Sequence, residues 1–308
     1  MFTTQSEGSG HLVIAGAGPA AQALVRRLTG ASSTSLSPAA RLHQTITILS
    51  NRDDCPASLL ELAALPNVSV RFGQAASYID LEAHTVTTDE GLEFPYEQLV
   101  IATGSWPKFP PVQGADHALS YSTIDDAESI GAAVKDVTTV LGRRPLGILV
   151  GTGPAAGQAE AVLRARGVRP IRTTLRPAAV MPSVAGSVLP ATGIVFEDGS
   201  SMNGDLVVLA EERAARNGLA ESAGLRTAPD GGILVGADFA TSVPGIWAIG
   251  DAASRDGQRL GLVMSSEAAA GHCAARLEEA AARLEEAAGR LDMASGGQAE
   301  GVDQSAAA

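Results

Sequence analysis

The sequence predicts an α/β protein with two parallel-sheet domains, and two observations support this fold class. Two Gly-rich turns with the same G-x-G-x-x-A spacing lie far apart, one starting at Gly16 and the other at Gly151. Each turn follows a short aliphatic run typical of a buried strand and precedes a stretch with helical periodicity. The 308 residues are 45% hydrophobic, which is enough for the cores of two domains.

The first turn has the features of a dinucleotide-binding turn. The preceding run "HLVIA" predicts a buried strand, and the following "AAQALVRRL" predicts a helix with one apolar face. Gly16 permits the tight turn, Gly18 lets the backbone approach a pyrophosphate, and Ala21 lets helix and strand pack closely. The positive end of the helix would then face the phosphates. With Pro19, these residues are the first candidate cofactor site in a Rossmann-like domain.

The second strand of this domain departs from the usual pattern. It reads "TITILS", and the residue that follows it is Asn51, where an acidic residue normally accepts a hydrogen bond from a ribose. Asp53 and Asp54 come slightly too late in the chain. We expect Asn51 to take the ribose contact.

Two further segments identify a family. The stretches at 96–114, "YEQLVIATGSWPKFPPVQG", and 241–254, "TSVPGIWAIGDAAS", are each a hydrophobic strand that ends in a small-residue turn. With the first turn, they resemble the three fingerprints of FAD/NAD(P)-dependent pyridine nucleotide-disulfide oxidoreductases. "ATGSWPKFPPVQGAD" followed by "YSTIDDAESI" is most similar to the flavin module of NAD(P)H nitrite reductase large subunits, then to rubredoxin and ferredoxin reductases. The resemblance covers roughly residues 11 to 275.

The resemblance implies FAD and a set of contacts for it. The pyrophosphate would lie on the first turn, Ala75 near the adenine, and Thr103 and Gly104 where the chain crosses near FAD. Gly250 and Asp251 would meet the ribityl chain or pyrophosphate, and Met264 would lie beside the flavin. The alternative role for Asp251 is a helix N-cap.

The resemblance also explains why there are two turns, since in this family a second dinucleotide domain is inserted into a split FAD domain. We expect the FAD domain at 1–121 and 236–285, the NAD(P)-binding-like domain at 122–235, and a helical end with a disordered tail at 286–308. Gly151, Gly153 and Ala156 repeat the first turn. Thr174 stands where an acid would select NADH, and with Arg172 and Arg176 beside it NADPH is slightly favoured over NADH. The alternative for the arginines is a solvated strand end.

The inserted domain is shorter than in the relatives. After Pro177 the usual helix and third strand are missing, and "TGIVFEDGSSMNGDLVVLAEE" predicts a β-hairpin with "EDGSS" as its turn. The shortened sheet would have an incomplete face or edge, so we expect a protein partner or a second copy of the chain to cover it. The segment after Asn51 is also short, which would leave the flavin ring open. Cys55 lies near it, and we interpret it as an inert thiol rather than as a reactive thiol beside the flavin.

The C-terminal region replaces the relatives' interface domain with "HCAARLEEAAARLEEAAGRLD". Leu277, Leu284 and Leu291 recur every seven residues, and Glu279 with Arg283 and Glu286 with Arg290 form i,i+4 pairs. This pattern favours a solvated terminal helix over a short coiled coil.

Composition limits the function classes. A net charge of −12 argues against nucleic-acid binding, and the N-terminal segment shows neither a signal peptide nor a membrane span, so we expect a cytoplasmic protein. The five histidines show no metal-ligand spacing, and no hydrolase or P-loop motif occurs. The leading hypothesis is a FAD-dependent NAD(P)H oxidoreductase that serves a partner protein or small acceptor. The alternatives are a structural FAD or adenine-nucleotide subunit, and a flavoprotein reduced by its partner. No side chain stands out as a catalytic acid or base.

Overall fold

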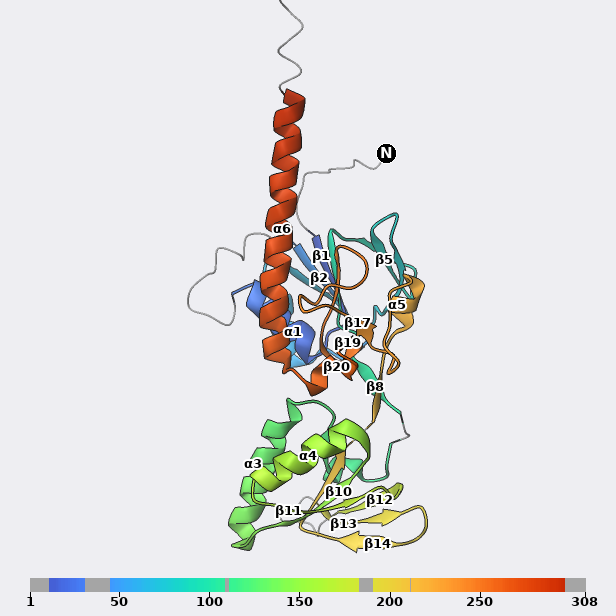
Figure 1. The fold of residues 1–308 in the computed structure, drawn as a ribbon, viewed down its shortest axis with the longest axis vertical. Coiled ribbons are helices and arrows are strands. Elements are labelled where there is room, and N and C mark those ends of the chain that lie inside the picture. The colour runs from blue at the N-terminus through green and yellow to red at the C-terminus, as the bar shows by residue number, and fades with distance from the viewer. Residues whose placement is uncertain (1–10, 31–44, 109–110, 183–190, 211, 297–308) are drawn as a thin grey trace, which may run out of the picture.

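The computed structural model describes residues 11–30, 45–108, 111–182, 191–210 and 212–296. Figure 1 shows two α/β bodies stacked along the long axis, with a long C-terminal helix beside the first body and extending past it. The predicted α/β class with two Rossmann-like domains is confirmed, because each body is built on its own parallel sheet.

The first body holds a five-stranded parallel sheet in the order β18-β7-β1-β2-β3. Its strands are β1 (His11–Ala15), β2 (Thr45–Leu49), β3 (Val68–Arg71), β7 (Gln98–Ile101) and β18 (Ile246–Ala248). The predicted runs "HLVIA" and "TITIL" form neighbouring strands, with His11 opposite Thr45. Leu12, Ile14 and Ile48 are fully buried, as expected of central strands with both faces covered.

Helices and smaller sheets surround this parallel sheet. They are α1 (Pro19–Leu28), α2 (Ala57–Ala63), α5 (Gly218–Ser222) and α6 (Ser266–Gly296), the antiparallel sheet of β4 (Ala76–Asp80), β5 (Thr85–Thr88) and β6 (Glu93–Pro95), and the small sheet of β17 (Ile233–Leu234), β19 (Ala253–Arg255) and β20 (Gln258–Arg259). Helix α1 packs against α6, and α5 packs against β4. The first core therefore joins residues from both ends of the chain.

The second body has a four-stranded parallel sheet in the order β11-β10-β15-β9. Its elements are β9 (Leu119–Tyr121), α3 (Asp126–Leu141), β10 (Leu146–Val150), α4 (Gly153–Ala165), β11 (Arg169–Thr173), β12 (Pro177–Pro182), β13 (Ala191–Phe196), β14 (Ser201–Asn203) and β15 (Leu206–Ala210). The helices pack on one face of the sheet around Leu163 and Val208. The antiparallel sheet β12-β13-β14 covers the other face through Val180, Ile194 and Phe196.

The predicted hairpin is confirmed, because β13 and β14 pair antiparallel with Ile194 opposite Met202. The expectation of an incomplete face is wrong, because the three-stranded sheet buries that face. Strand β11 ends the parallel sheet, and its Ile171 side chain is 43% exposed. The edge, rather than the face, is where the short domain leaves apolar surface in contact with solvent.

The link between the bodies moves the expected boundaries. Strand β8 (Ser105–Pro107) and strand β16 (Arg213–Ala215) pair antiparallel and carry the chain out of the first body and back. Strand β9 pairs with β15 of the second sheet, so residues 119–121 belong to the second body and not, as expected, to the first part of the FAD domain. Leu219, Leu225 and Ile233 pack in the first core, so the return falls well before the expected boundary at 235. The boundaries follow the packing of these apolar residues.

The C-terminal helix is only partly as expected. Leu277 is fully buried in the first core, so the N-terminal half of α6 is a packed helix and the expectation of a solvated one is wrong there. Glu279 pairs with Arg276 at 2.7 Å, in place of the expected Arg283, while the expected pair of Glu286 and Arg290 forms at 3.4 Å. The expectation of a disordered tail from Met293 is wrong for its first residues, because α6 continues to Gly296. The rest of that tail, from 297 onward, and the side chains of Leu284 and Leu291 lie outside the described residues. No helix in the described ranges is long and apolar enough to cross a membrane.

Candidate functional site

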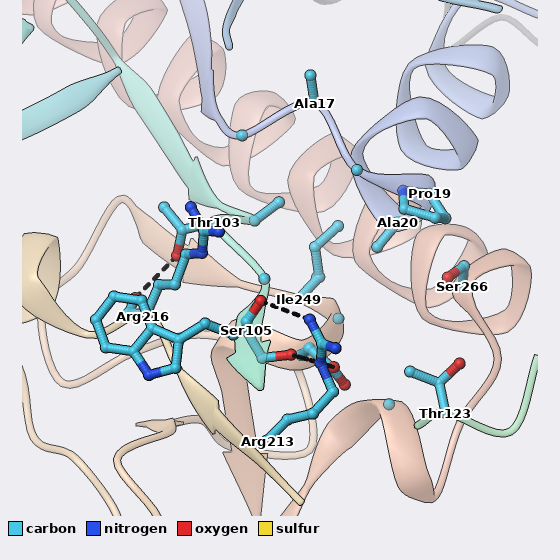
Figure 2. A pocket seen from close by; sticks show the side chains of 18 of the residues that line it. Ala17, Pro19, Ala20, Thr103, Ser105, Thr123, Arg213, Arg216, Ile249 and Ser266 are labelled. Atoms are coloured by element: carbon cyan, nitrogen blue, oxygen red, sulfur yellow. Dashed lines mark hydrogen bonds and ion pairs between the residues drawn. The ribbon is translucent and has the colours of Figure 1, made fainter. Parts of the chain in front are cut away.

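A cavity of about 760 Å³ opens at the carboxyl ends of strands β1, β7 and β18, next to the link between the two bodies. Figure 2 shows side chains from well-separated parts of the chain around it. This is the place where open parallel sheets bind ligands, and its volume suits a large one. Its lining comprises Gly16–Ala20, Leu49, Asn51, Arg52, Ala75, Ala76, Ala102–Trp106, Ser122, Thr123, Asp125, Asp126, Arg213, Arg216, Gly218, Leu219, Ile249–Asp251, Gly261, Met264 and Ser266.

The first Gly-rich turn forms one wall of this cavity. Gly16 has φ +117°, and a Cβ there would lie 2.2 Å from the Ala102 carbonyl oxygen, so both conformation and space require glycine. A Cβ on Gly18 would meet no described heavy atom within 4 Å. Pro19 begins α1, whose first turn has no hydrogen bond from a capping side chain among the described residues. The turn therefore presents open space and backbone N–H groups, the combination that accommodates a pyrophosphate.

The other predicted residues of the first site come together at this cavity. Asn51 follows β2, Ala75 precedes β4, and Thr103 and Gly104 follow β7. Gly250 and Asp251 lie in a short 3-10 helix after β18, and Met264 lies just before α6. Of the predicted first-site residues, Ala21 alone is absent from the lining, because it is fully buried beneath the turn. Ala21 keeps its predicted packing role without reaching the cavity.

Asp251 is the centre of a buried charged cluster that the sequence did not reveal. Ser105 Oγ donates to Asp251 Oδ2 at 2.6 Å, and Arg259 Nη1 donates to the same oxygen at 3.1 Å. Burial raises the pKa of Asp251, and the charge of Arg259 and the hydrogen bond from Ser105 oppose that rise. Arg213 adds a donor to Ser105 Oγ at 2.8 Å and lies 4.0 Å from the carboxylate.

The geometry does not support a helix N-cap role for Asp251. Ile249 is the cap residue of the 3-10 helix, and no side-chain cap bond is made there in the described chain. Asp251 Oδ1 is buried and finds no hydrogen-bond partner among the described residues. A buried acceptor without a donor carries an energetic cost, which is typical of a functional site.

Two more cavity residues went unpredicted. Arg216 lies 5.9 Å from the centre of the Trp106 ring, and Thr103 Oγ1 donates to the Arg216 carbonyl oxygen at 3.0 Å (Figure 2). They lie on or beside the paired strands β8 and β16, which no local motif marks. Arg259 is not in the lining, and the surrounding sequence "DGQRLGLVM" does not indicate its ion pair with Asp251.

The second Gly-rich turn has the predicted backbone but lies outside this cavity. Gly151 and Gly153 adopt φ of +150° and +67°, and Ala156 is fully buried against the sheet. Thr174 and Arg176 are exposed beyond the end of β11. None of these five is in the lining of the cavity described above. The two predicted sites are therefore separate, as expected of one turn in each body.

The two cysteines differ in environment. Cys55 is exposed, and Cys273 is buried in α6, where burial raises its pKa to about 12. Neither forms a disulfide.

Curated proteins and solved structures resemble this chain along most of its length. The assimilatory nitrate reductase electron transfer subunit of Bacillus subtilis is 30% identical over 219 residues, which is 64% of this chain and 28% of that protein. The nitrite reductase (NADH) large subunit of Escherichia coli is 27% identical over 227 residues, 64% of this chain and 26% of that protein. The chain thus spans about a quarter of the length of these relatives.

Among solved structures, the covalent putidaredoxin reductase–putidaredoxin complex has a TM-score of 0.51 at 21% identity, covering 89% of this chain and 76% of that chain. A FAD-dependent pyridine nucleotide-disulphide oxidoreductase from Desulfovibrio vulgaris has a TM-score of 0.51 at 20% identity, covering 87% and 71%. Both share the fold. The model of the pyridine nucleotide-disulphide oxidoreductase family matches residues 10–171 and 147–272. With two Gly-rich turns on two parallel sheets, the chain belongs to this family.

Proposed function

We propose that this protein is a FAD-dependent oxidoreductase that takes electrons from NADH or NADPH and passes them to a partner protein or small acceptor. The observation that carries the proposal is the shared cavity, in which residues predicted for FAD from six separate segments lie together. Such convergence of distant segments is expected of a built site rather than of chance turns.

The shape of the cavity fits the cofactor. Gly18 leaves space above the turn, and the N-terminus of α1 offers N–H groups and a positive dipole end to a pyrophosphate. The volume of about 760 Å³ lies within the range of cofactor pockets, roughly 300–1,000 Å³. FAD, once bound, supplies the electron-transfer chemistry.

The chain's own residues position the cofactor. Gly16 permits the tight turn, Gly18 lets the backbone approach the pyrophosphate, and Asn51 offers its amide to the ribose. Asp251, fixed by Ser105 and Arg259, supplies a carboxylate near the sugar chain. Met264 supplies an apolar contact. We assign no residue to proton transfer.

The second turn is the proposed nicotinamide site, with Gly151, Gly153 and Ala156 beneath the pyrophosphate and Thr174 and Arg176 near the ribose. The relative named nitrite reductase (NADH) large subunit supports a nicotinamide donor. The partner is proposed from relatives named an electron transfer subunit and a putidaredoxin reductase. The exposed edge strand β11 is a place where this partner or a second copy can pair.

One observation favours an alternative, a flavoprotein subunit that nicotinamide does not reduce. The carboxylate of Glu212 accepts a hydrogen bond from Thr152 Oγ1, inside the second turn. A negative charge there competes with the pyrophosphate of a donor. The alternative predicts bound flavin that stays oxidised with NADH and NADPH.

The deciding experiment is an anaerobic absorbance spectrum of the purified protein before and after addition of NADH, then NADPH. We expect a flavin band that bleaches with one of them. A flavin band that bleaches with neither NADH nor NADPH would refute the proposal of a nicotinamide donor. A spectrum without a flavin band, even after incubation with FAD, would refute the proposal that the protein binds FAD.

A further inference from the structure

The N-terminus of α4 carries a carboxylate from its own chain. Thr152, the N-cap residue of α4, donates its hydroxyl to Glu212 Oε1. A Cβ on Gly153 would lie 3.9 Å from the same oxygen. The Glu212 side chain is thus at the end of the helix where anions are stabilised, the position a dinucleotide pyrophosphate takes in this type of turn.

The backbone holds Glu212 in this place. A Cβ on Gly151 would lie 2.5 Å from the Ala210 carbonyl oxygen, so the end of β15 lies directly against the turn. Two residues later, the Glu212 carbonyl oxygen accepts from the Lys108 N–H at 2.9 Å. Lys108 Nζ also lies 3.8 Å from Glu212 Oε2. Lys108 therefore contacts both the main chain and the side chain of Glu212 and holds this residue over the turn.

The first Gly-rich turn of the same chain can be compared with the second. A Cβ on Gly18 meets no described atom within 4 Å, whereas the corresponding Gly153 has a carboxylate oxygen near it. The first turn lines the 760 Å³ cavity, and no residue of the second turn does. Of these two turns of the same sequence spacing, the second has an acidic side chain at the helix N-terminus, and a Cβ on Gly18 in the first meets no described atom within 4 Å.

We propose that Glu212 sets a low affinity for NADH and NADPH at the second turn, by occupying the anion position until a pyrophosphate displaces it. This inference rests on the proposed function, which assigns the nicotinamide nucleotide to that turn. Displacement releases Lys108 to the incoming phosphates, and Arg172, which donates to the Gly151 carbonyl oxygen at 3.3 Å, adds a second cation. The site then has the cations to receive an anion once Glu212 has moved.

The test compares nucleotide affinity in FAD-loaded wild type, Glu212→Gln, Glu212→Ala and the control Glu197→Gln. Both Glu212 variants remove the charge, and the Ala variant also removes the hydrogen bond to Thr152. Glu197→Gln makes the same change of net charge in the same body, on an exposed turn beyond β13. The dissociation constants for NADH and NADPH are measured anaerobically by nucleotide fluorescence, and flavin reduction is followed by absorbance.

Removal of one negative charge next to the pyrophosphate should tighten the binding of NADH and NADPH by roughly tenfold. Added salt should reduce the difference in affinity between the Glu212 variants and wild type. Tighter binding in both Glu212 variants and not in Glu197→Gln supports the inference. Equal or weaker binding in both overturns it, and the proposed function stands if nicotinamide still bleaches the wild-type flavin. Tighter binding without flavin reduction in any form supports the inference and refutes the nicotinamide donor. Absence of binding in every variant overturns both.

Discussion

Replacing Arg259 by Gln tests the buried cluster around Asp251. Arg259 donates to Asp251 Oδ2 at 3.1 Å and to the Ser122 carbonyl oxygen at 2.8 Å. Its side chain is 6% exposed and that of Asp251 is 12% exposed, so the substitution leaves a carboxylate with little solvent to stabilise it. Removing one partner of a buried pair costs about 3–5 kcal/mol.

The expected loss lies at the low end of that range. Ser105 still donates to Asp251 at 2.6 Å, and Arg213 lies 4.0 Å away, so the carboxylate keeps part of its stabilisation. We expect a loss of about 3 kcal/mol in the free energy of unfolding. At about 2–4 °C per kcal/mol for a domain of this size, Tm should fall by about 6–12 °C.

The loss should also depend on pH in a defined direction. Burial already raises the pKa of Asp251, with Arg259 and Ser105 opposing the rise, so removal of Arg259 raises it further. A raised folded-state pKa means that stability is present at low pH and is lost as pH rises through that pKa. The difference between wild type and Arg259→Gln should therefore be smallest at low pH, where Asp251 is protonated in both proteins, and should grow as pH rises past the raised pKa of Asp251 in the wild type.

The assay is thermal and urea unfolding of flavin-free wild type, Arg259→Gln and the control Arg255→Gln. Arg255 pairs at 3.8 Å with Asp256, whose side chain is 92% exposed, so its loss should cost at most about 1 kcal/mol. A loss below about 1 kcal/mol for Arg259→Gln, or one that does not change with pH, would refute the assignment of a buried ion pair.

Three further predictions concern other parts of the chain. Gly18→Ala should leave the free energy of unfolding of the flavin-free protein within about 0.5 kcal/mol of wild type, because the position has φ −73° and open space. The same substitution should weaken FAD binding at least about tenfold in a fluorescence titration, and an unchanged affinity would contradict the placement of the pyrophosphate on this turn. Leu277→Ala should cost about 2–5 kcal/mol in urea unfolding, because Leu277 is fully buried in the first core, and a loss below about 1 kcal/mol would mean that α6 does not dock. A chromogenic disulfide reagent at neutral pH should label Cys55 in the folded protein and reach Cys273 only on unfolding, because burial raises the pKa of Cys273 to about 12; labelling of both thiols before unfolding would contradict the burial of Cys273.

The sequence by itself determined the local pieces of this protein. Each Gly-rich turn could be predicted together with the strand before it and the helix after it. Buried strands need aliphatic runs, and the turns need residues without a Cβ. Gly16 is an example, since its positive φ and its contact with Ala102 exclude any side chain. The residues predicted around FAD could be located because three segments resemble the fingerprints of the family. Asn51 and Thr103 also follow parallel strands, which end at one edge of the sheet.

Only the tertiary structure decided which distant polar groups meet. Ser105, Arg213, Asp251 and Arg259 form one cluster because the link β8-β16 passes beside the end of β18. Glu212 covers the second turn because β15 ends against Gly151. Hydrophobic periodicity encodes which face of an element is buried, but the path of a connecting segment depends on how whole sheets and helices pack. The charges that tune each site lie on those connecting segments.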